Sequence, residues 1–310
     1  MQAAPPVTLR GLLIKARDAV ADGTGIVLAS CLPLARCLLV AAAPVAYRFR
    51  RTRHFQRRVV DALAVRLKKR GGAERSYRVG SMRIAMDVSD FCVRHHYFSG
   101  ECYEPDTTEL FMAVVRPSDI VLDVGANHGY FTVLAAHLAH SQGRIAAFEA
   151  NPAAATVLRR HVQANQVADR VEIIEAAVNE AGNGRVQFFV GRGDDDVYSS
   201  MCPSEFAIRQ GWVSTDQMVS VPTCSLDNWM GAHEWPHVRL LKIDVEGAEE
   251  SVLKGMAMTL AQSPPDFIVC ETTWGEAAHR SLVACGYAPE RLCGSQDYGN
   301  ILYVRQGIAR

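Results

Sequence analysis

The sequence predicts an α/β fold built on a doubly wound, mostly parallel β-sheet with an antiparallel edge strand. Three observations lead to this prediction. From Asp119 onward, short apolar runs alternate with stretches of helical periodicity, as in repeated βαβ units. The first of these runs ends in a glycine-containing turn, VLDVGANHGYF, where such sheets place their ligands. Hydrophobic residues make up 49% of the 310 residues, which allows a sizeable core.

The elements before the sheet are a hairpin and a helix. The hairpin spans SYRVGSMRIAMDV, with its turn at Gly80 and Ser81. The helix opens at DTTEL, where Asp106 is the predicted N-cap and Glu109 follows three residues later. It is expected to end by Arg116, because Pro117 follows.

The core elements then follow in order. Strand IVLDV, helix GYFTVLAAHLAH, strand RIAAFE, a helix over residues 152–165 and strand RVEIIEAAV form the first half. Residues 184–230 are less regular and hold one strand-like run, RVQFFV. The alternation resumes with strand RLLKIDV, a helix from Glu249, strand DFIVCE and another helix, and NILYVR is the predicted antiparallel edge strand.

The N-terminal region differs in charge from the rest of the chain. Residues 1–78 hold 16 of the 33 Lys and Arg residues but only 4 of the 33 Asp and Glu residues. They therefore carry a net charge of +12, and residues 79–310 carry −12. We expect a basic, partly apolar helical extension over residues 1–78 and a separate domain over residues 79–310.

Residues 24–47 are apolar enough to raise the question of a membrane span. Arg36 lies in the middle of this run, and Pro33 and Pro44 interrupt any helix, so a clean span is not expected. Two interpretations of residues 24–70 stay open: helices that pack on the domain with their arginines in water, and peripheral contact with an anionic membrane. No nucleic-acid partner is expected, since no binding motif accompanies the charge.

The nine cysteines are scattered and form no CxxC pair. Cys31, Cys37, Cys270 and Cys285 lie in apolar runs typical of buried free thiols. A signal peptide is not indicated, because the apolar stretch begins late and precedes the basic run RFRRTRHFQRR. The expected compartment is the cytoplasm, with the cytoplasmic face of the membrane as the alternative. The sequence leaves the oligomeric state open.

The turn after the first core strand indicates the ligand. Gly125 and Gly129 allow the backbone to approach a ligand closely, but the third glycine of the dinucleotide fingerprint is missing. Asp123 disfavours a diphosphate and suits a ligand with an ammonium group, and Glu149, at the end of the next strand, suits ribose hydroxyls. S-adenosylmethionine has both groups, so we expect it as the cofactor.

Five motifs resemble the FkbM-type family of S-adenosylmethionine-dependent methyltransferases. They are YEPDTTELF, VLDVGANHGYFT, FEANP, TCSLD and LKIDVEGAEESVLKG, and the resemblance runs from about Tyr77 to Val304. It implies a Rossmann-like class I methyltransferase fold and O-methylation of a hydroxyl on a sugar, glycolipid or natural product. It also implies a set of cofactor residues, namely Asp123, Gly125, Asn127, Gly129, Glu149 and Asn151, with Glu104 in a segment that folds over the cofactor.

Three carboxylates are expected to converge beside the cofactor. Asp244 and Glu246 follow the strand RLLKIDV, and Glu271 ends the neighbouring strand DFIVCE. They serve either as general base and acceptor-binding groups or, for Asp244 and Glu271, as ligands of Mg²⁺. Lys242 alternates with Asp244 on its strand, so it either stabilises the carboxylates in the site or is a structural ion-pair partner.

Two other functions remain as alternatives to O-methylation. An N-methyltransferase acting on a small amine would use the same cofactor site, because fold does not decide the acceptor. A membrane-associated scaffold without catalysis would instead use residues 1–78 as its functional part. Intact acids at the expected positions argue against that scaffold.

Overall fold

The computed structural model describes residues 50–69, 74–87, 97–98, 102–191, 199–201, 213–294 and 298–308. The chain forms two compact units, one of residues 1–77 and 85–103 and the other of residues 78–84 and 104–310. Peripheral membrane contact is one of the two open interpretations of residues 24–70, and of these, residues 24–49 and 70 lie outside the described residues, Cys31 and Cys37 among them. No helix in the described part of the chain is long and apolar enough to cross a membrane.

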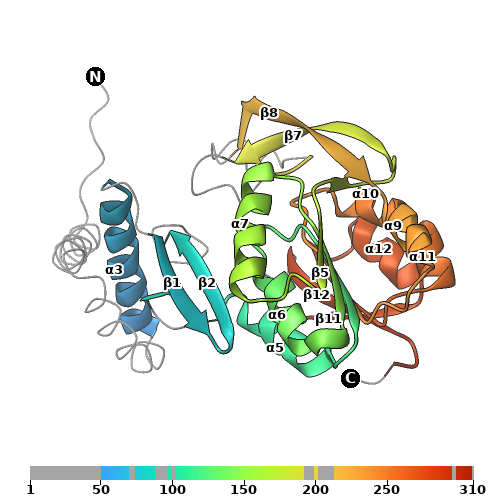
Figure 1. Cartoon of the computed structure of the whole chain (residues 1–310), viewed down its shortest axis with the longest axis horizontal. Coiled ribbons are helices and arrows are strands. Elements are labelled where there is room, and N and C mark those ends of the chain that lie inside the picture. The colour runs from blue at the N-terminus through green and yellow to red at the C-terminus, as the bar shows by residue number, and fades with distance from the viewer. Residues whose placement is uncertain are drawn as a thin grey trace, which may run out of the picture. The chain divides into compact units, whose positions relative to one another are not determined.

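The N-terminal part contains helix α3 (Arg50–Lys69), which is labelled in Figure 1. Its apolar residues Val59, Val60, Leu63 and Leu67 recur at helical spacing and are buried, so the helix is amphipathic. Strands β1 (Glu74–Val79) and β2 (Met82–Asp87) form the predicted two-stranded hairpin. Its turn contains Gly80 at φ +59°. The boundary near residue 78 stays a prediction.

The larger unit is built on a seven-stranded sheet in the order β11-β12-β10-β9-β3-β4-β5. Its strands are β3 (Ile120–Val124), β4 (Arg144–Phe148), β5 (Val171–Ile174), β9 (Leu240–Ile243), β10 (Phe267–Thr273), β11 (Tyr287–Arg291) and β12 (Tyr298–Arg305). Strands β5, β4, β3, β9 and β10 run parallel, and β12 is antiparallel to both β10 and β11. The predicted α/β fold with a doubly wound, mostly parallel sheet is confirmed.

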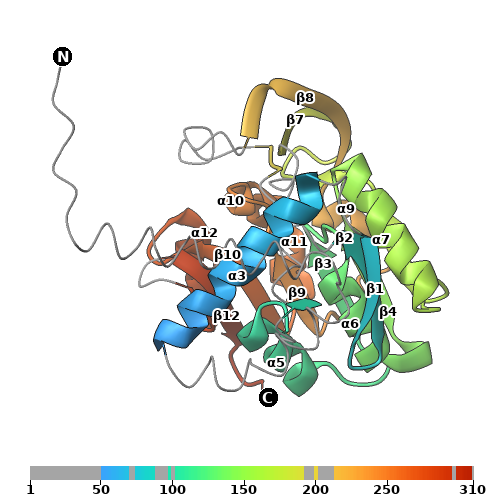
Figure 2. The same cartoon turned by 90° about the vertical axis from the view of Figure 1, so that its left-hand side faces the viewer.

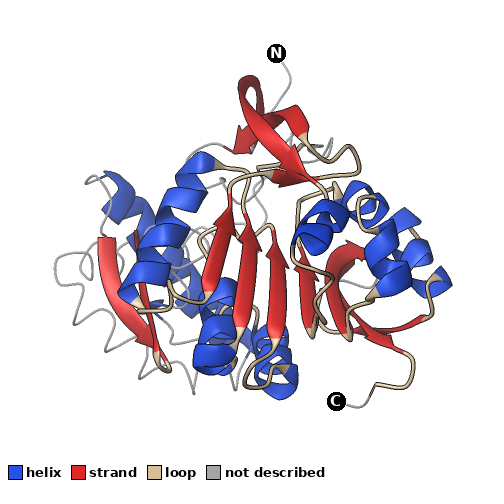
Figure 3. Cartoon of the chain, turned by 45° about the vertical axis from the view of Figure 1, so that its right-hand side comes forward, coloured by secondary structure: helices blue, strands red, loops and turns tan. Residues whose placement is uncertain are grey.

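Helices lie on both sides of this sheet (Figures 1 and 3). They are α5 (Pro105–Val114), α6 (Tyr130–Leu138) and α7 (Pro152–Ala164) on one side, and α9 (Leu226–Ala232), α10 (Glu249–Lys254), α11 (Ala257–Gln262) and α12 (Ala277–Ala284) on the other. A short 3₁₀ helix, η1 (His140–Gln142), follows α6. Helix α5 begins two residues earlier than predicted, because Pro105 occupies its first turn and Glu104, not Asp106, is the N-cap.

The two faces of the sheet differ in polarity near its carboxyl end. Val124, Ile243, Cys270 and Ile301 are neighbours in register on adjacent strands and belong to the main apolar core. Side chains alternate between faces along a strand, so the residues between them share the opposite face. That face carries Asp123, Lys242, Glu271 and Asn300, and it holds the candidate site.

A second sheet has three strands in the order β6-β8-β7. They are β6 (Ala177–Val178), β7 (Gly184–Gly191) and β8 (Val213–Cys224). Strands β7 and β8 form a curved pair beyond the ends toward which the parallel strands point (Figures 2 and 3). The predicted run RVQFFV is β7, whereas its long partner β8 was not predicted.

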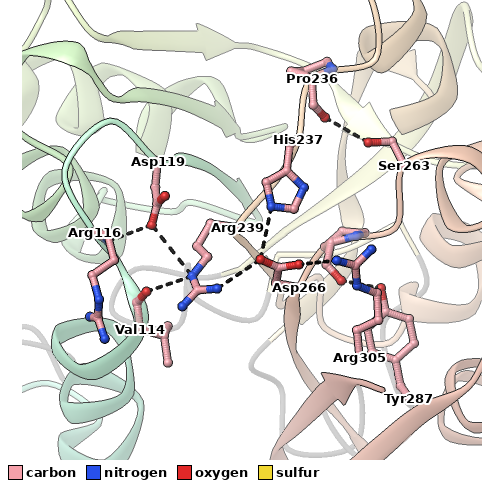
Figure 4. A network of polar contacts seen from close by, with 11 residues as sticks. Val114, Arg116, Asp119, Pro236, His237, Arg239, Ser263, Asp266, Tyr287 and Arg305 are labelled. Atoms are coloured by element: carbon pink, nitrogen blue, oxygen red, sulfur yellow. Dashed lines mark hydrogen bonds and ion pairs between the residues drawn. The ribbon is translucent and has the colours of Figure 1, made fainter. Parts of the chain in front are cut away.

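The opposite end of the parallel strands is held by a network of ion pairs (Figure 4). Asp266, which is buried, accepts hydrogen bonds from Arg239 Nη1 at 3.0 Å and Arg305 Nη2 at 2.6 Å, and His237 Nε2 lies 3.1 Å away. Arg239 Nε also donates to the Val114 carbonyl at 3.0 Å. The network therefore joins β9, β10 and β12 to the end of α5.

Two details differ from the sequence prediction. Strand NILYVR is antiparallel as predicted, but β11 pairs with its other side, so β12 has a neighbour on both sides. The described cysteines are free, and Cys270 is buried as expected. Cys285 is exposed instead, because it follows the last turn of α12 rather than facing the core.

Candidate active site

The turn after β3 contains two glycines, Gly125 and Gly129, whose backbone conformations make it tight. Gly125 has φ +83° and Gly129 has φ +85°, a region that glycine enters without strain. A methyl group at Gly125 would overlap the backbone carbonyl of Asp244, so the turn lies directly against the end of β9. The Gly125 and Ala126 amides donate to the Phe148 carbonyl at 3.0 Å. The ends of β3, β4 and β9 therefore meet at this turn.

Glu149 joins the two loops that follow β3 and β4. Its Oε2 accepts from the Asn127 amide and its Oε1 from the Asn151 amide, both at 2.7 Å. Asn151 in turn caps α7, since its Oδ1 accepts from the Ala153 amide at 3.0 Å. Burial raises the pKa of Glu149 to about 7, although the two backbone donors act to lower it. Each carboxylate oxygen keeps a second lone pair for a ligand hydroxyl.

Asp123 is 1% exposed, and the two oxygens of its carboxylate differ in their hydrogen bonding. Its Oδ2 accepts from Thr132 Oγ1 at 2.6 Å, whereas its Oδ1 has no hydrogen-bond partner among the described residues. Asn127 Oδ1 is also buried without a partner in that part of the chain. Buried acceptors that lack donors are costly, so this turn is suited to a ligand that brings donors. Burial raises the pKa of Asp123, and Lys242 opposes the rise.

Lys242 lies at the centre of the acidic side chains. Its side chain is 3% exposed, and Nζ donates to Asp244 Oδ2 at 2.7 Å. The ammonium also lies 5.0 Å from the centroid of the Phe131 ring, a cation–π contact. Burial alone would lower the pKa of Lys242, but Asp244, Glu104 and Asp123 outweigh it and raise the pKa. Lys242 is therefore charged at neutral pH.

The three predicted carboxylates do converge. Asp244, Glu246 and Glu271 each offer an oxygen, and these oxygens lie within 4.8 Å of one another. Burial raises the pKa of Glu271 to about 11, helped by the negative charge of Asp244 and by the hydrogen bond it makes with that side chain. Burial and Asp244 also raise the pKa of Glu246 to about 8. At neutral pH Glu271 is protonated and donates to Asp244.

Asp244 is the ionised member of this group. Burial alone would raise its pKa, but the Lys242 ammonium and the hydrogen bond from Glu271 outweigh burial and lower it. The turn that follows is tightly wound, with Glu246 at φ +54° and Gly247 at φ +105°. Glu249 fixes this turn, since its Oε1 accepts from the Gly247 amide at 3.0 Å. Glu246 thus faces the cluster from a strained backbone position.

Glu104 joins the same group from the start of α5. Its backbone has φ 38° and ψ 74°, a left-handed conformation that is uncommon for glutamate. Its Oε2 accepts from Asn300 Nδ2 at 2.6 Å. Burial raises the pKa of Glu104, and Lys242 opposes the rise. The structure therefore brings together Glu104, assigned above to the cofactor, and the carboxylate cluster.

Two residues of this site were not predicted. Thr132 lies on the first turn of α6 and orients Asp123, and its only sequence signal is a hydroxyl three residues after Gly129. Asn300 lies on β12, far from the motifs in sequence, and no local pattern marks it. Both are buried polar residues, which is the property that distinguishes them.

The sheet order, the antiparallel β12 and the acids at the carboxyl end define a Rossmann-like class I methyltransferase fold. A family model described as "Methyltransferase FkbM domain" matches residues 123–288, more than half of the chain. The chain belongs to this family, as its motifs led us to expect.

Curated relatives match over about half of this chain. It is 29% identical over 161 residues to the 2-O-methyltransferase NoeI of Sinorhizobium fredii, an alignment that covers 50% of this chain and 64% of NoeI. It is 31% identical over 180 residues to the 31-O-demethyl-FK506 methyltransferase FkbM of Streptomyces tacrolimicus, covering 51% and 65%. The chain thus spans a little under two thirds of the length of each.

A further relative and a solved structure are more distant. The hexuronic acid methyltransferase AglP of Haloferax volcanii is 26% identical over 169 residues, covering 54% of this chain and 62% of AglP. The crystal structure of methyltransferase FkbM from Methylobacillus flagellatus is 16% identical with a TM-score of 0.39, covering 69% of this chain and 52% of that one.

Proposed function

We propose that the chain is an S-adenosylmethionine-dependent O-methyltransferase whose acceptor is a hydroxyl on a sugar, a glycolipid or a natural product. The observation that carries the proposal is that ligand-binding acceptor oxygens and an ionised carboxylate lie at the same edge of the sheet. The oxygens Asp123 Oδ1 and Asn127 Oδ1, which have no partner among the residues that the structure describes, offer acceptors to a ligand, and the ionised Asp244 lies at the end of the adjacent strand.

The residues of the turn fit the cofactor that the family implies. Asp123 Oδ1 and Asn127 Oδ1 would accept hydrogen bonds from its ammonium group, and the free lone pairs of Glu149 would accept from its ribose hydroxyls. Bound there, S-adenosylmethionine would supply its methyl group: the acceptor oxygen forms the new C–O bond while the C–S bond breaks, and the electron pair stays on sulfur.

Asp244 is the residue we assign as general base. It is ionised at neutral pH, whereas burial keeps Glu271 protonated and raises the pKa of Glu246 to about 8. A base with a low pKa accepts the hydroxyl proton as positive charge develops on the acceptor oxygen, which needs only modest base strength. Lys242 holds the Asp244 carboxylate in place through its 2.7 Å hydrogen bond.

Relatives support oxygen over nitrogen as the acceptor atom. The names of NoeI and of the FK506 enzyme specify O-methylation, and AglP is named for a hexuronic acid. A hydroxyl must also lose its proton during methylation, so it needs a general base such as a carboxylate. An amine acceptor depends less on such a base. The glycan or natural-product acceptor is inferred from these names together with the acidic cluster.

Mg²⁺ at Asp244 and Glu271 remains the competing proposal. We favour a site that works without Mg²⁺, because the Lys242 ammonium and the proton on Glu271 already supply positive charge to Asp244. Nothing in the comparisons favours the metal. Acceptor turnover that is lost with EDTA and restored by Mg²⁺ would establish the metal instead.

Calorimetric titration of S-adenosylhomocysteine tests the cofactor site first. We expect the wild-type protein to bind it and NAD not to bind. Asp123→Asn keeps the size of the side chain but removes its negative charge. Glu149→Gln makes the matching change at the residue assigned to the ribose hydroxyls. Each substitution should weaken binding at least about tenfold. Met258→Ala, at an exposed position on α11, is the matched control that should leave affinity unchanged. Equal affinity in all four proteins would refute the assigned site.

Methyl transfer to a hydroxyl tests the reaction itself. Wild-type protein is incubated with S-adenosylmethionine carrying a labelled methyl group and a panel of glycosides and amines. Transfer to glycosides that falls about a hundredfold or more in Asp244→Asn supports the assigned base. Transfer to amines alone, or full turnover in Asp244→Asn, contradicts it.

A further inference from the structure

The polar face of the sheet continues past Glu271 onto β12. In the antiparallel pair of β10 and β12, Glu271 is opposite Asn300 and Thr273 is opposite Tyr298. Directly opposed residues point to the same face, and so do residues two apart on one strand. Glu271, Asn300 and Tyr298 therefore share the face that carries Asp123 and Lys242. The family model stops at residue 288, so that match assigns nothing on β12.

Asn300 presents a hydrogen-bond acceptor, Oδ1, on this face. The residue is 4% exposed, and its Nδ2 donates to Glu104 Oε2 at 2.6 Å and lies 3.2 Å from Thr107 Oγ1. The Glu104 contact fixes the orientation of the amide, because a carboxylate oxygen takes the donor end. Asn300 Oδ1 consequently points elsewhere, and it has no partner in the described part of the chain.

Tyr298 adds an aromatic surface beside that amide. The residue is 45% exposed, unlike the fully buried Tyr303 on the same strand. Burial of the phenol, followed by the charges of Glu271 and Glu246, raises the pKa of Tyr298, which agrees with a phenol that lies near the carboxylates. The exposed part of the ring thus presents an apolar surface at the edge of the cluster.

We propose that Asn300 and Tyr298 form the acceptor subsite, and that they select a pyranoside with two adjacent hydroxyls. Asn300 Oδ1 accepts a hydrogen bond from the hydroxyl next to the one that is methylated, and the Tyr298 ring covers the C–H face of the sugar. Cβ atoms of opposed residues lie about 5 Å apart, and Glu271, opposite Asn300, is hydrogen-bonded to Asp244. Asp244 and Asn300 are therefore close enough for each to reach one hydroxyl of a neighbouring pair. The inference rests on the proposed function and specifies its substrate class.

Saturation-transfer NMR on the full chain tests the subsite without requiring turnover. The probes are the methyl glycosides of glucose, galactose, mannose and rhamnose, mixed with protein saturated with S-adenosylhomocysteine. We expect saturation of the ring C–H protons in the wild-type protein. Tyr298→Ala should abolish the signal, whereas Tyr298→Phe should keep it, because the ring remains. Wild-type protein that binds S-adenosylhomocysteine but shows no glycoside signal overturns the subsite and leaves the cofactor proposal intact.

Asn300→Ala separates a contact with the acceptor from an indirect effect through Glu104. We expect the glycoside affinity to fall about tenfold while the affinity for S-adenosylhomocysteine stays within about twofold of wild type. With the best glycoside as acceptor, KM rises and kcat changes less. A loss of cofactor affinity of similar size would make Asn300 a support for Glu104 only and would overturn the proposal. Unchanged glycoside affinity would overturn it as well.

Discussion

Replacing Lys242 with methionine removes the buried positive charge in the acidic cluster. The substitution keeps most of the apolar stem of the side chain, so it changes charge more than packing. In the native protein, Lys242 Nζ is 2.7 Å from Asp244 Oδ2, and the Lys242 side chain is 3% exposed. At that separation an effective dielectric constant of about 20 gives an attraction of roughly 6 kcal/mol before desolvation. The loss leaves Asp244 without its main partner.

Protonation limits how large the cost becomes. An uncompensated carboxylate takes up a proton instead of staying charged, so at about pH 7 the cost approaches the free energy of protonating an acid of pKa about 4, which is about 4 kcal/mol. At about pH 5 the same reasoning gives only about 1.5 kcal/mol. In the variant the folded protein holds a proton that the unfolded chain releases above about pH 4, so its stability falls as pH rises.

Urea unfolding followed by tryptophan fluorescence measures this effect. All four tryptophans lie after residue 211, so the signal reports the methyltransferase domain. We expect Lys242→Met to be destabilised by about 4 kcal/mol at about pH 7 and by about 1.5 kcal/mol at about pH 5. Adding Asp244→Asn should recover most of the loss, because replacing a whole buried pair costs little. Equal destabilisation at both pH values would show that the loss came from packing against Phe131 and would refute the reasoning.

Three further predictions follow from the same structure. Gly125→Ala should destabilise by at least about 2 kcal/mol more than Gly275→Ala in urea unfolding, because both have φ near +80° but only Gly125 lies against the Asp244 carbonyl. The affinity for S-adenosylhomocysteine should rise as pH increases through about 7, because ribose hydroxyls favour ionised Glu149, and Glu149→Gln should remove this dependence in calorimetry. Asp266→Asn should lower the free energy of unfolding by about 3 kcal/mol without changing that affinity, since its network lies at the other end of the sheet (Figure 4).

The sequence predicted the sheet well because each core strand carries its own local signal. Runs such as IVLDV and DFIVCE are short, apolar and separated by helical stretches, so their order along the chain determines a doubly wound sheet. Strand β8 was missed because its stretch TDQMVSVPTC mixes polar residues and a proline, and it forms by pairing with β7. Strand β11 contains Pro289, which local reasoning disfavours in a strand but which an edge position tolerates.

The site was predictable where its residues end strands of the parallel sheet. Asp123, Glu149, Asp244 and Glu271 all lie at carboxyl ends, and the topology alone brings such ends together. Asn300 could not be found in this way, because β12 runs antiparallel and brings its amino end to that edge. Its role depends on a register between segments far apart in sequence, which no local pattern records.

Buried charges are balanced at one end of the sheet and unbalanced at the other. At the amino end, Asp266 is matched by Arg239 and Arg305, so its charge is satisfied within the chain and serves stability. At the carboxyl end, Lys242 faces Asp244, Asp123 and Glu104, and those acids outnumber it. A folded domain tolerates such an excess only by keeping some acids protonated or by binding a cation. Glu271 takes the first course, since its pKa is raised to about 11. For the remaining acids we expect a positively charged ligand to bind best, so S-adenosylmethionine should be favoured over its product, which has lost the sulfonium charge but keeps the ammonium group.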